Sequence, residues 1–140
     1  MLDEVCKSLP RDFASHQHIT YVEPFVGGGA VMFWILQTYP NIERAVISDI
    51  NEELICTYRI IKENVEELIA ELTHIQDEYI PLSAEDRKAY FMEKRARFNT
   101  KQTTPVETAG LFIFLNRTCF NGLYRVNSKG AFNVPHGKYA

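Results

Sequence analysis

The hydrophobic pattern near the N-terminus predicts two strands separated by a helix. Residues 19–22 and 44–48 are short apolar runs typical of buried strands. Between them, residues 30–36 read AVMFWIL, which predicts a strongly apolar helix that Pro40 and Asn41 end. A strand, a helix and a second strand in this order form a right-handed parallel crossover. We therefore expect part of an α/β sheet.

Helical periodicity dominates the middle of the chain. After Asn51, apolar residues recur at intervals of three and four as far as Tyr79, with the glutamates largely on other faces. This pattern predicts one long amphipathic helix. Ser83 and Asp86 fit a capping box, which predicts the start of a second helix that runs to about Phe98.

A third helix start has the clearest signal. Thr104 suits the N-cap, Pro105 the first helical position and Glu107 the third. The body of this helix, AGLFIFL, is apolar on every side, so we expect it to be buried. Beyond it, turn residues around Gly130 separate two short β-prone runs, which predicts a hairpin at about residues 121–137.

Composition indicates that the chain can bury one core. Of its 140 residues, 46% are hydrophobic, and no apolar run approaches the length of about 18 residues that a membrane span requires. The N-terminus lacks the basic and then apolar order of a signal peptide, so we expect a cytoplasmic protein. Cys6, Cys56 and Cys119 form no C-x-x-C pair, which favours ordinary buried thiols. His16 and His18 have no third ligand nearby, so we expect no metal site.

Charge is distributed unevenly along the chain. Residues 1–80 hold 14 acidic and 5 basic side chains, whereas residues 81–140 hold 4 acidic and 10 basic ones. Positive charge over a whole segment indicates a polyanionic partner. The alternative is that the exposed surfaces of the helices simply carry different charged side chains. Several basic residues lie around the predicted hairpin: Arg117, Arg125, Lys129 and Lys138.

The stretch EPFVGGGAV brings a glycine-rich turn to the end of the first predicted strand. Such a turn exposes backbone N–H groups at the carboxyl edge of a parallel sheet, where ligands bind. The nicotinamide pattern requires a further glycine at position 32, which is Met, and Glu23 puts a negative charge where a pyrophosphate would lie. A dinucleotide oxidoreductase is therefore disfavoured, while a purely structural turn stays an alternative.

Asp49 changes the balance between these interpretations. It ends the second predicted strand, 22 residues beyond Gly27, a spacing typical of an acid that accepts hydrogen bonds from ribose hydroxyls. A ligand with a ribose and positive charge, but without phosphate, suits both carboxylates. S-adenosylmethionine has a ribose, an ammonium and a sulfonium, and it is the cofactor that we expect.

Three segments together resemble the DNA adenine-N6 methyltransferases of the Dam type: EPFVGGGAV, SDIN at residues 48–51, and NRTCFNGLYRVNSKGAFNVPHGKY at residues 116–139. The resemblance covers about residues 20–139 and is most specific in the last segment. It implies an α/β fold, a partial Rossmann-like S-adenosylmethionine-dependent methyltransferase fold, with the first part of the cofactor-binding domain at 1–55. Residues 56–140 are then a mostly helical target-recognition domain with a β-hairpin.

The resemblance also implies which residues form the cofactor site. In the family, the first motif holds the methionine part of the cofactor, and the acid after the second strand holds the ribose. Asn51 lies next to that acid, although it suits a helix cap equally well. The implied cofactor-binding residues are Glu23, Pro24, Phe25, Gly27, Gly29, Asp49 and Asn51.

Carried over in the same way, the last segment implies contacts to double-stranded DNA. Arg125 would read guanine, Arg117 would hold phosphate, and Phe120 would enter the base stack near the target adenine. Alternatively, Phe120 and Leu123 are core residues and Arg125 is a solvated charge. Leu123 and Pro135 would contact thymine methyls, and Asn121 would contact the backbone or a base. The implied DNA-binding residues are therefore Arg117, Phe120, Asn121, Leu123, Arg125 and Pro135.

The resemblance implies methyl transfer from S-adenosylmethionine to N6 of adenine in duplex DNA, with GATC as the favoured target and a restriction endonuclease as a candidate partner. The Asp-Pro-Pro-Tyr element that carries the catalytic acceptors in the family is not in this sequence, and we expect it beyond Ala140. We therefore name no catalytic residue and interpret the chain as a fragment that is inactive alone, with apolar sheet surface uncovered. The alternative is a non-catalytic DNA-binding module with a structural glycine loop.

Overall fold

The computed structural model describes residues 2–137 and forms two compact units, Met1–Glu52 and Glu53–Ala140. The sequence places the boundary after residue 55, and the roles that it assigns to the two parts stay predictions. Lys138, one of the basic residues near the predicted hairpin, lies outside the described residues. Within the described part of the chain, no helix is long and apolar enough to cross a membrane.

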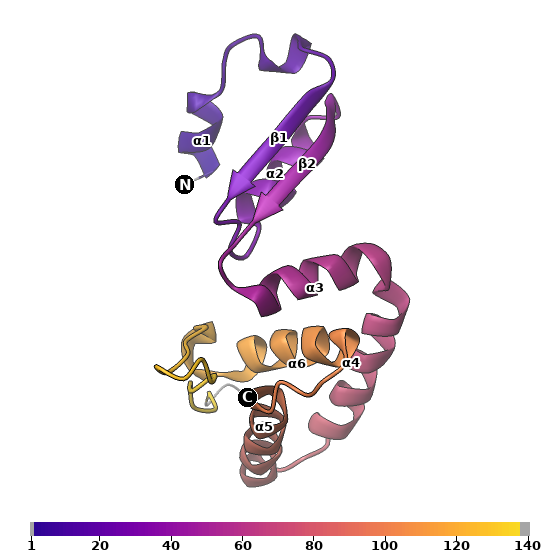
Figure 1. Ribbon diagram of the computed structural model, residues 1–140, viewed down its shortest axis with the longest axis vertical. Helices are drawn as coiled ribbons and strands as arrows, with labels where there is room; N and C mark the ends of the chain where they lie inside the picture. The colour runs from indigo at the N-terminus through magenta and orange to yellow at the C-terminus, as the bar shows by residue number, and fades with distance from the viewer. Residues whose placement is uncertain (1, 138–140) are drawn as a thin grey trace. The chain divides into compact units, whose positions relative to one another are not determined.

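The first unit contains a parallel crossover. β1 (Ile19–Pro24) pairs in parallel with β2 (Ile42–Ser48), and α2 (Ala30–Thr38) connects the two strands (Figure 1). This confirms the strand, helix and strand order that the hydrophobic pattern predicts. Two preceding elements are not predicted by the sequence: α1 (Leu2–Ser8) and a 3-10 turn (Phe13–Ser15). Cys6 in α1 is exposed, so the expectation of a buried thiol is wrong for this residue. The described sheet has two strands, so a larger Rossmann-like sheet stays an expectation.

One face of this sheet exposes a pair of apolar side chains. Val22 and Val46 lie opposite each other in the strand register, and both residues are exposed. Parallel strands are usually covered on both faces, because crossover helices pack against them. The exposed pair agrees with the expectation that these 140 residues leave apolar sheet surface uncovered.

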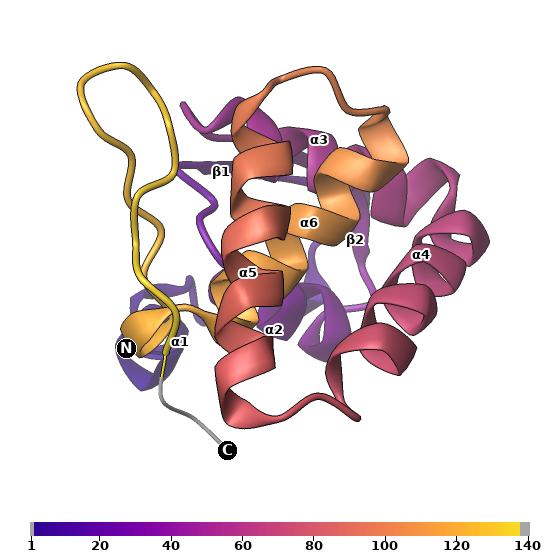
Figure 2. The same cartoon turned by 90° about the horizontal axis from the view of Figure 1, so that it is seen from below.

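The second unit is built around α6 (Pro105–Thr118). α4 (Val65–Tyr79) and α5 (Ala84–Asn99) both contact α6, as Figure 2 shows, and α3 (Glu52–Glu63) precedes them in the chain. A short 3-10 turn (Phe120–Gly122) follows α6 directly. The unit is thus mostly helical, as the apolar periodicity predicts.

The two helix starts that capping residues predict are confirmed. The Ser83 hydroxyl accepts a hydrogen bond from the Asp86 N–H at 3.2 Å, and the Thr104 hydroxyl accepts one from the Glu107 N–H at 3.2 Å. Each bond satisfies an N–H group that the first helical turn leaves without a partner. Pro105 takes the first helical position, where its missing N–H removes no bond.

The expectation of one long helix after Asn51 is wrong, because the segment forms two helices. α3 ends at Glu63 and α4 begins at Val65, while Asn64 between them has φ −139° and ψ 42°, outside the helical region. Asparagine is a poor helix former, since its side chain competes with the helix for backbone groups. The apolar repeat continues across the break, so periodicity alone does not reveal it.

The core of the second unit lies along α6. Its body is buried, as its apolar composition predicts: Ala109, Gly110, Leu111, Phe112, Phe114 and Leu115. Phe91 and Phe98 of α5 and Ile75 of α4 belong to the same cluster of buried side chains. A Cβ at Gly110 would lie 2.7 Å from Cγ of Glu71, so this glycine permits the close approach of α4 to α6.

The predicted hairpin is an irregular loop rather than a pair of regular strands. We call residues 119–137 the C-terminal loop. Two antiparallel bridges close it: Val126 with Phe132, and Cys119 with His136. Gly130 at its tip has φ 75°, the left-handed region that favours glycine. Phe132 and Val134 are buried with the side chains of α5 and α6, so the loop is fixed to the helical core.

Candidate cofactor and nucleic-acid sites

A glycine turn joins the end of β1 to the start of α2. Gly27 and Gly29 have φ 50° and 72°, a backbone region that residues with a Cβ rarely adopt. The Val26 N–H donates to the Ser48 carbonyl oxygen at 3.0 Å, which ties the turn to the end of β2. A Cβ at Gly28 would meet no heavy atom within 4 Å, so the turn has an open side.

Asp49 lies beside this turn at the carboxyl end of β2. Its carboxylate accepts hydrogen bonds from the Asn51 N–H and the Gly27 N–H, each at 3.0 Å. These two bonds, that of Asn51 first, hold the pKa of Asp49 below its ordinary value, although burial opposes them. The side chain is therefore an ionised acceptor at the rim of the sheet, and it also fixes the conformation of the turn.

A second carboxylate, Glu23, lies near the end of β1. The Tyr21 hydroxyl donates to Glu23 Oε2 at 2.7 Å, and both side chains are half-buried. Burial raises the pKa of Tyr21, and the Glu23 carboxylate raises it further, so the phenol stays protonated and keeps donating. The glycine turn thus follows one oriented carboxylate, Glu23 on β1, and donates a hydrogen bond to a second one, Asp49 at the end of β2.

Two exposed apolar residues lie within two positions of these carboxylates in the sequence. Phe25 is 83% exposed and has φ 62°, which is uncommon for a bulky residue, and Ile50 is 94% exposed. Pro24 is exposed as well. Asn51 directly precedes α3, so its two interpretations stay open. Sequence reasoning does not single out Ile50, although its position directly after the rim carboxylate is the signal that could have done so.

The residues implied in DNA binding are all exposed: Arg117, Phe120, Asn121, Leu123, Arg125 and Pro135. Phe120 and Leu123 are 52% and 57% exposed, so the alternative that they are core residues is wrong. Arg125 is oriented by a hydrogen bond from its Nε to Asn133 Oδ1 at 2.8 Å. The Phe120 N–H donates to the Pro135 carbonyl oxygen at 2.9 Å, which brings two of the implied contacts together.

Two side chains of α5 fix the C-terminal loop in place. Arg95 donates from Nη1 to the Val134 carbonyl oxygen at 3.0 Å. Asn99 bonds both backbone groups of Phe132. The backbone of the loop is therefore held from its inner side, while the side chains implied in DNA binding are exposed. Such an arrangement suits a recognition loop on a rigid support.

Ion pairs neutralise part of the positive charge in the second half of the chain. Three basic residues of α5 and the turn after it have acidic partners: Arg97 with Glu107, Lys94 with Glu78, and Lys101 with Glu53. Among the described residues, Arg117, Arg125 and Lys129 form no ion pair. The cations of this half that form no ion pair in the described part of the chain thus lie on the C-terminal loop, at the end of α6 and on α5, where Arg87, Lys88 and Arg95 lie.

Histidine and carboxylate pairs occur in the first unit. His16 Nε2 lies 3.1 Å from Asp12, and His18 Nδ1 lies 2.6 Å from Glu43. Within residues 2–137, no group of three or more His, Cys, Asp or Glu side chains is placed to hold a metal ion. Each of these histidines thus has a single acidic neighbour on the surface.

Comparison with known proteins identifies the family. The whole chain, residues 1–140, matches the family described as D12 class N6 adenine-specific DNA methyltransferase. The chain is 45% identical over 141 residues to Type II methyltransferase M.MjaIII of Methanocaldococcus jannaschii, a match that covers 99% of this chain and 48% of that protein. It is 38% identical over 141 residues to a DNA adenine methylase of Haemophilus influenzae, covering 99% of this chain and 43% of the relative.

The chain belongs to the D12 class of N6 adenine-specific DNA methyltransferases. It spans less than half the length of the curated relatives that it matches. The resemblance that the sequence motifs indicate is thereby confirmed at the level of the family. The cofactor, the target sequence and the role of each single residue stay predictions.

Proposed function

We propose that the protein transfers a methyl group from S-adenosylmethionine to N6 of adenine in duplex DNA. The unit Met1–Glu52 supplies the first part of the donor site, and the unit Glu53–Ala140 recognises the duplex. The observation that carries this proposal is the position of Asp49, whose carboxylate lies 3.0 Å from the Gly27 N–H at an open glycine turn. The family description supports adenine in DNA as the acceptor.

In the donor site, the residues of the chain hold and orient the cofactor, which supplies an electrophilic methyl group when bound. Asp49 accepts hydrogen bonds from the ribose hydroxyls, because a carboxylate keeps acceptor sites beyond its two backbone bonds. Glu23 attracts the cationic amino end. The open side at Gly28 lets the cofactor approach the backbone, and Phe25 and Ile50 offer apolar contact to its adenine ring.

On the second unit, the C-terminal loop reads the duplex. Arg125 gives paired hydrogen bonds to O6 and N7 of guanine, with its orientation set by Asn133. Arg117 neutralises a phosphate, and Phe120 acts as an apolar wedge that stabilises the opened duplex beside the extruded adenine. GATC is the target that we propose, because this loop resembles those of family members that read GATC.

For these 140 residues alone we propose binding without turnover. N6 of adenine is a poor nucleophile because its lone pair is delocalised into the ring, so methyl transfer needs hydrogen-bond acceptors that align the amino group. The Asp-Pro-Pro-Tyr acceptors that the family resemblance implies are not among these residues. A restriction endonuclease that cuts the same sequence is the partner that we propose for the whole protein.

Isothermal titration calorimetry with S-adenosylmethionine tests the donor site. We expect binding heat from the wild-type chain and a loss of affinity of at least about tenfold in Asp49→Ala, since ribose hydrogen bonds to a charged acceptor are removed. Asp3→Ala is the matched control, because it removes an exposed acid from α1. A wild-type chain without binding heat, or equal affinities of Asp49→Ala and wild type, contradicts the donor site and favours the non-catalytic DNA-binding module.

The acceptor is tested on the whole protein with a labelled methyl group. We expect label in adenine N6 of duplex DNA, and more of it in duplexes that contain GATC than in duplexes in which that sequence is scrambled. Label only in cytosine, RNA or protein rejects the proposed reaction. Equal labelling of both duplexes leaves the reaction in place and rejects the target sequence.

A further inference from the structure

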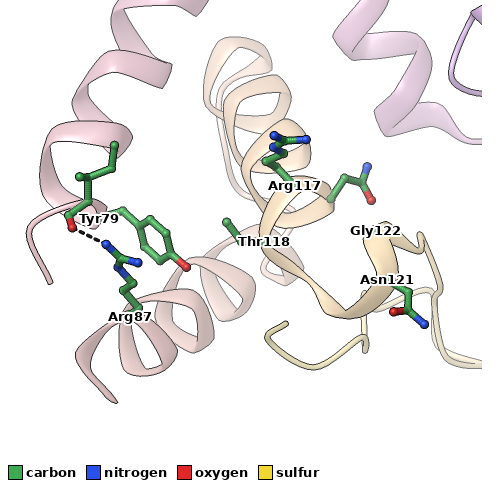
Figure 3. A pocket seen from close by; sticks show the side chains of 8 residues that line it. Tyr79, Arg87, Arg117, Thr118, Asn121 and Gly122 are labelled. Carbon is green, nitrogen blue, oxygen red and sulfur yellow. Dashed lines mark hydrogen bonds between the residues drawn. The ribbon is translucent and has the colours of Figure 1, made fainter. Parts of the chain in front are cut away.

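A pocket of about 980 Å³ lies where several helix ends of the second unit meet. Tyr79 lines it at the end of α4 and Arg87 in the first turns of α5, and the remaining walls come from the end of α6 and the 3-10 turn. Figure 3 shows the side chains around this space. We call it the helix-end pocket and define it by Tyr79, Arg87, Asn116, Arg117, Thr118 and Asn121.

Arg87 is held in this pocket with hydrogen-bonding capacity to spare. Its Nη2 donates to the Ile80 carbonyl oxygen at 2.5 Å, and its guanidinium lies 5.3 Å from the centre of the Tyr79 ring. Its Nε is buried and has no hydrogen-bond partner among the described residues. A buried donor without a partner is costly, so such a group is a sign that a further molecule completes the arrangement.

A second unpartnered group and a second cation lie in the same pocket. Asn116 Oδ1 is buried without a hydrogen-bond partner in the described part of the chain. Arg117, the next residue, is exposed on α6 and lines the same pocket, which Arg87 lines from α5 (Figure 3). Among the described residues that line the pocket there are two arginines and no acid.

The surroundings of the pocket are positively charged as well. Lys88 follows Arg87 on α5 and is exposed. Burial lowers the pKa of His136, and the charges of Arg87 and Lys88 lower it further. A pocket with two guanidinium groups and a neighbouring lysine attracts an anion, and guanidinium groups fit phosphate oxygens with paired hydrogen bonds.

We propose that the helix-end pocket binds the sugar-phosphate backbone of the DNA strand beside the opened base pair, with Arg87 and Arg117 on its phosphates. The pocket adjoins the proposed base contacts, because Asn121 and Gly122 of the pocket lie in the chain between Phe120 and Leu123, which we assign to the bases. This position favours a DNA strand over a free nucleotide as the ligand. The inference rests on the proposed function and extends the interface to α5. The Asn116 amide, turned by half a rotation, donates to the same backbone.

Such a contact has a measurable signature that differs from that of a base contact. Each phosphate that a cation neutralises releases counterions, so the slope of log affinity against log salt changes by about 0.9 per contact. The contact carries no sequence information. Losing it therefore weakens binding to every duplex alike and makes the salt dependence shallower.

The test measures the affinity of the full protein for a fluorescent duplex at several salt concentrations. For Arg87→Ala we expect affinity to fall about tenfold at low salt and the slope to fall by about 0.9, with the preference for GATC unchanged. Lys88→Ala is the matched control, because it removes the neighbouring charge outside the pocket, and we expect a smaller loss. Asn116→Asp adds a negative charge to the pocket at nearly constant shape and should weaken binding to all duplexes.

The outcomes separate this inference from the proposed function. If Arg87→Ala and Asn116→Asp bind as Lys88→Ala does, with the same salt slope, while Arg125→Ala still loses its guanine preference, the pocket is not a backbone site although the protein reads DNA. If the wild-type protein binds no duplex, both proposals fail. Should Arg87→Ala fold poorly, because the bond to Ile80 is lost, Asn116→Asp decides alone, since it leaves that bond in place.

Discussion

The side chain of Asn99 forms two hydrogen bonds with the backbone of Phe132, donating to its carbonyl oxygen at 3.0 Å and accepting from its N–H at 2.8 Å. Asn99 is the last residue of α5, and Phe132 is buried in the C-terminal loop. Phe132 already pairs with Val126 in an antiparallel bridge, and the Asn99 amide bonds its N–H and carbonyl on the other side, as a further strand of a sheet would. It fixes the loop that carries Arg125 to the helical core.

We predict that Asn99→Ala lowers the free energy of unfolding by about 1–3 kcal/mol, because it leaves two buried backbone groups of Phe132 without partners. Urea unfolding followed by circular dichroism measures the change. Asn64→Ala is the matched control, since the Asn64 side chain forms no capping hydrogen bond and lies between two helices. Equal stability of Asn99→Ala and wild type would mean that water replaces the amide and that the loop is not anchored there.

Two phenylalanines illustrate the difference between the core and the proposed DNA interface. Phe91 is fully buried against α6, whereas Phe120 is more than half exposed. Phe91→Ala should lower the free energy of unfolding by about 3–5 kcal/mol, because it leaves a cavity. Phe120→Ala should change stability by less than about 0.5 kcal/mol and should weaken binding to duplex DNA. Thermal unfolding and duplex binding measure the two effects, and strong destabilisation by Phe120→Ala contradicts its assignment as a wedge.

Local signals account for the features that the sequence predicts correctly. Ser83 and Thr104 bond N–H groups three residues ahead, so each helix start depends on a few neighbouring residues only. The spacing between Gly27 and Asp49 is equally informative, because a short strand, helix and strand bring these two residues to one rim. Such features follow from chain geometry and need no knowledge of the rest of the molecule.

Features that depend on tertiary packing are not predictable in this way. The break at Asn64 leaves the apolar repeat intact, and α4 packs against α6 beyond it. Arg87 is one of several basic residues in its helix, and its role in the pocket depends on where the end of α4 meets α5. The pairing of Arg97 with Glu107 likewise joins two helices and removes a cation that the charge count suggests is available.

His136 gives the stability of the second unit a pH dependence with a defined sign. Its Nε2 lies 2.8 Å from the Tyr79 hydroxyl, and burial first, then Arg87 and Lys88, lower its pKa. The unfolded chain binds a proton at this residue near pH 6.5, whereas the folded chain binds it only at lower pH. Stability is therefore complete above about pH 6.5 and falls as the pH drops below that value.

We predict that the free energy of unfolding falls less between about pH 7.5 and pH 5.5 in His136→Phe than in wild type, as measured by urea unfolding at both pH values. The carboxyl groups whose pKa is lowered, such as Asp49 and Glu107, titrate below this window and do not contribute. His74→Gln is the control for the removal of a histidine, because His74 is exposed on α4. An equal loss in His136→Phe and wild type would show that this histidine is not the group responsible.

Replacing Arg125 or Arg117 with alanine should affect DNA binding in different ways. Arg125 is aimed by Asn133, so Arg125→Ala should cost about 1–3 kcal/mol at one guanine and relax the preference there. Arg117→Ala should lower the affinity for all duplexes alike and reduce the slope of log affinity against log salt by about 0.9. Competition binding with duplexes changed at one base pair at a time measures both effects.

Asn133→Ala sharpens this comparison, because it keeps the arginine and removes only the acceptor that orients it. We expect a partial loss of preference at the same guanine that Arg125→Ala affects, with little change in binding to unrelated duplexes. If Arg125→Ala and Arg117→Ala both lower affinity uniformly, Arg125 is a phosphate contact, and the guanine must be read by another residue of the C-terminal loop.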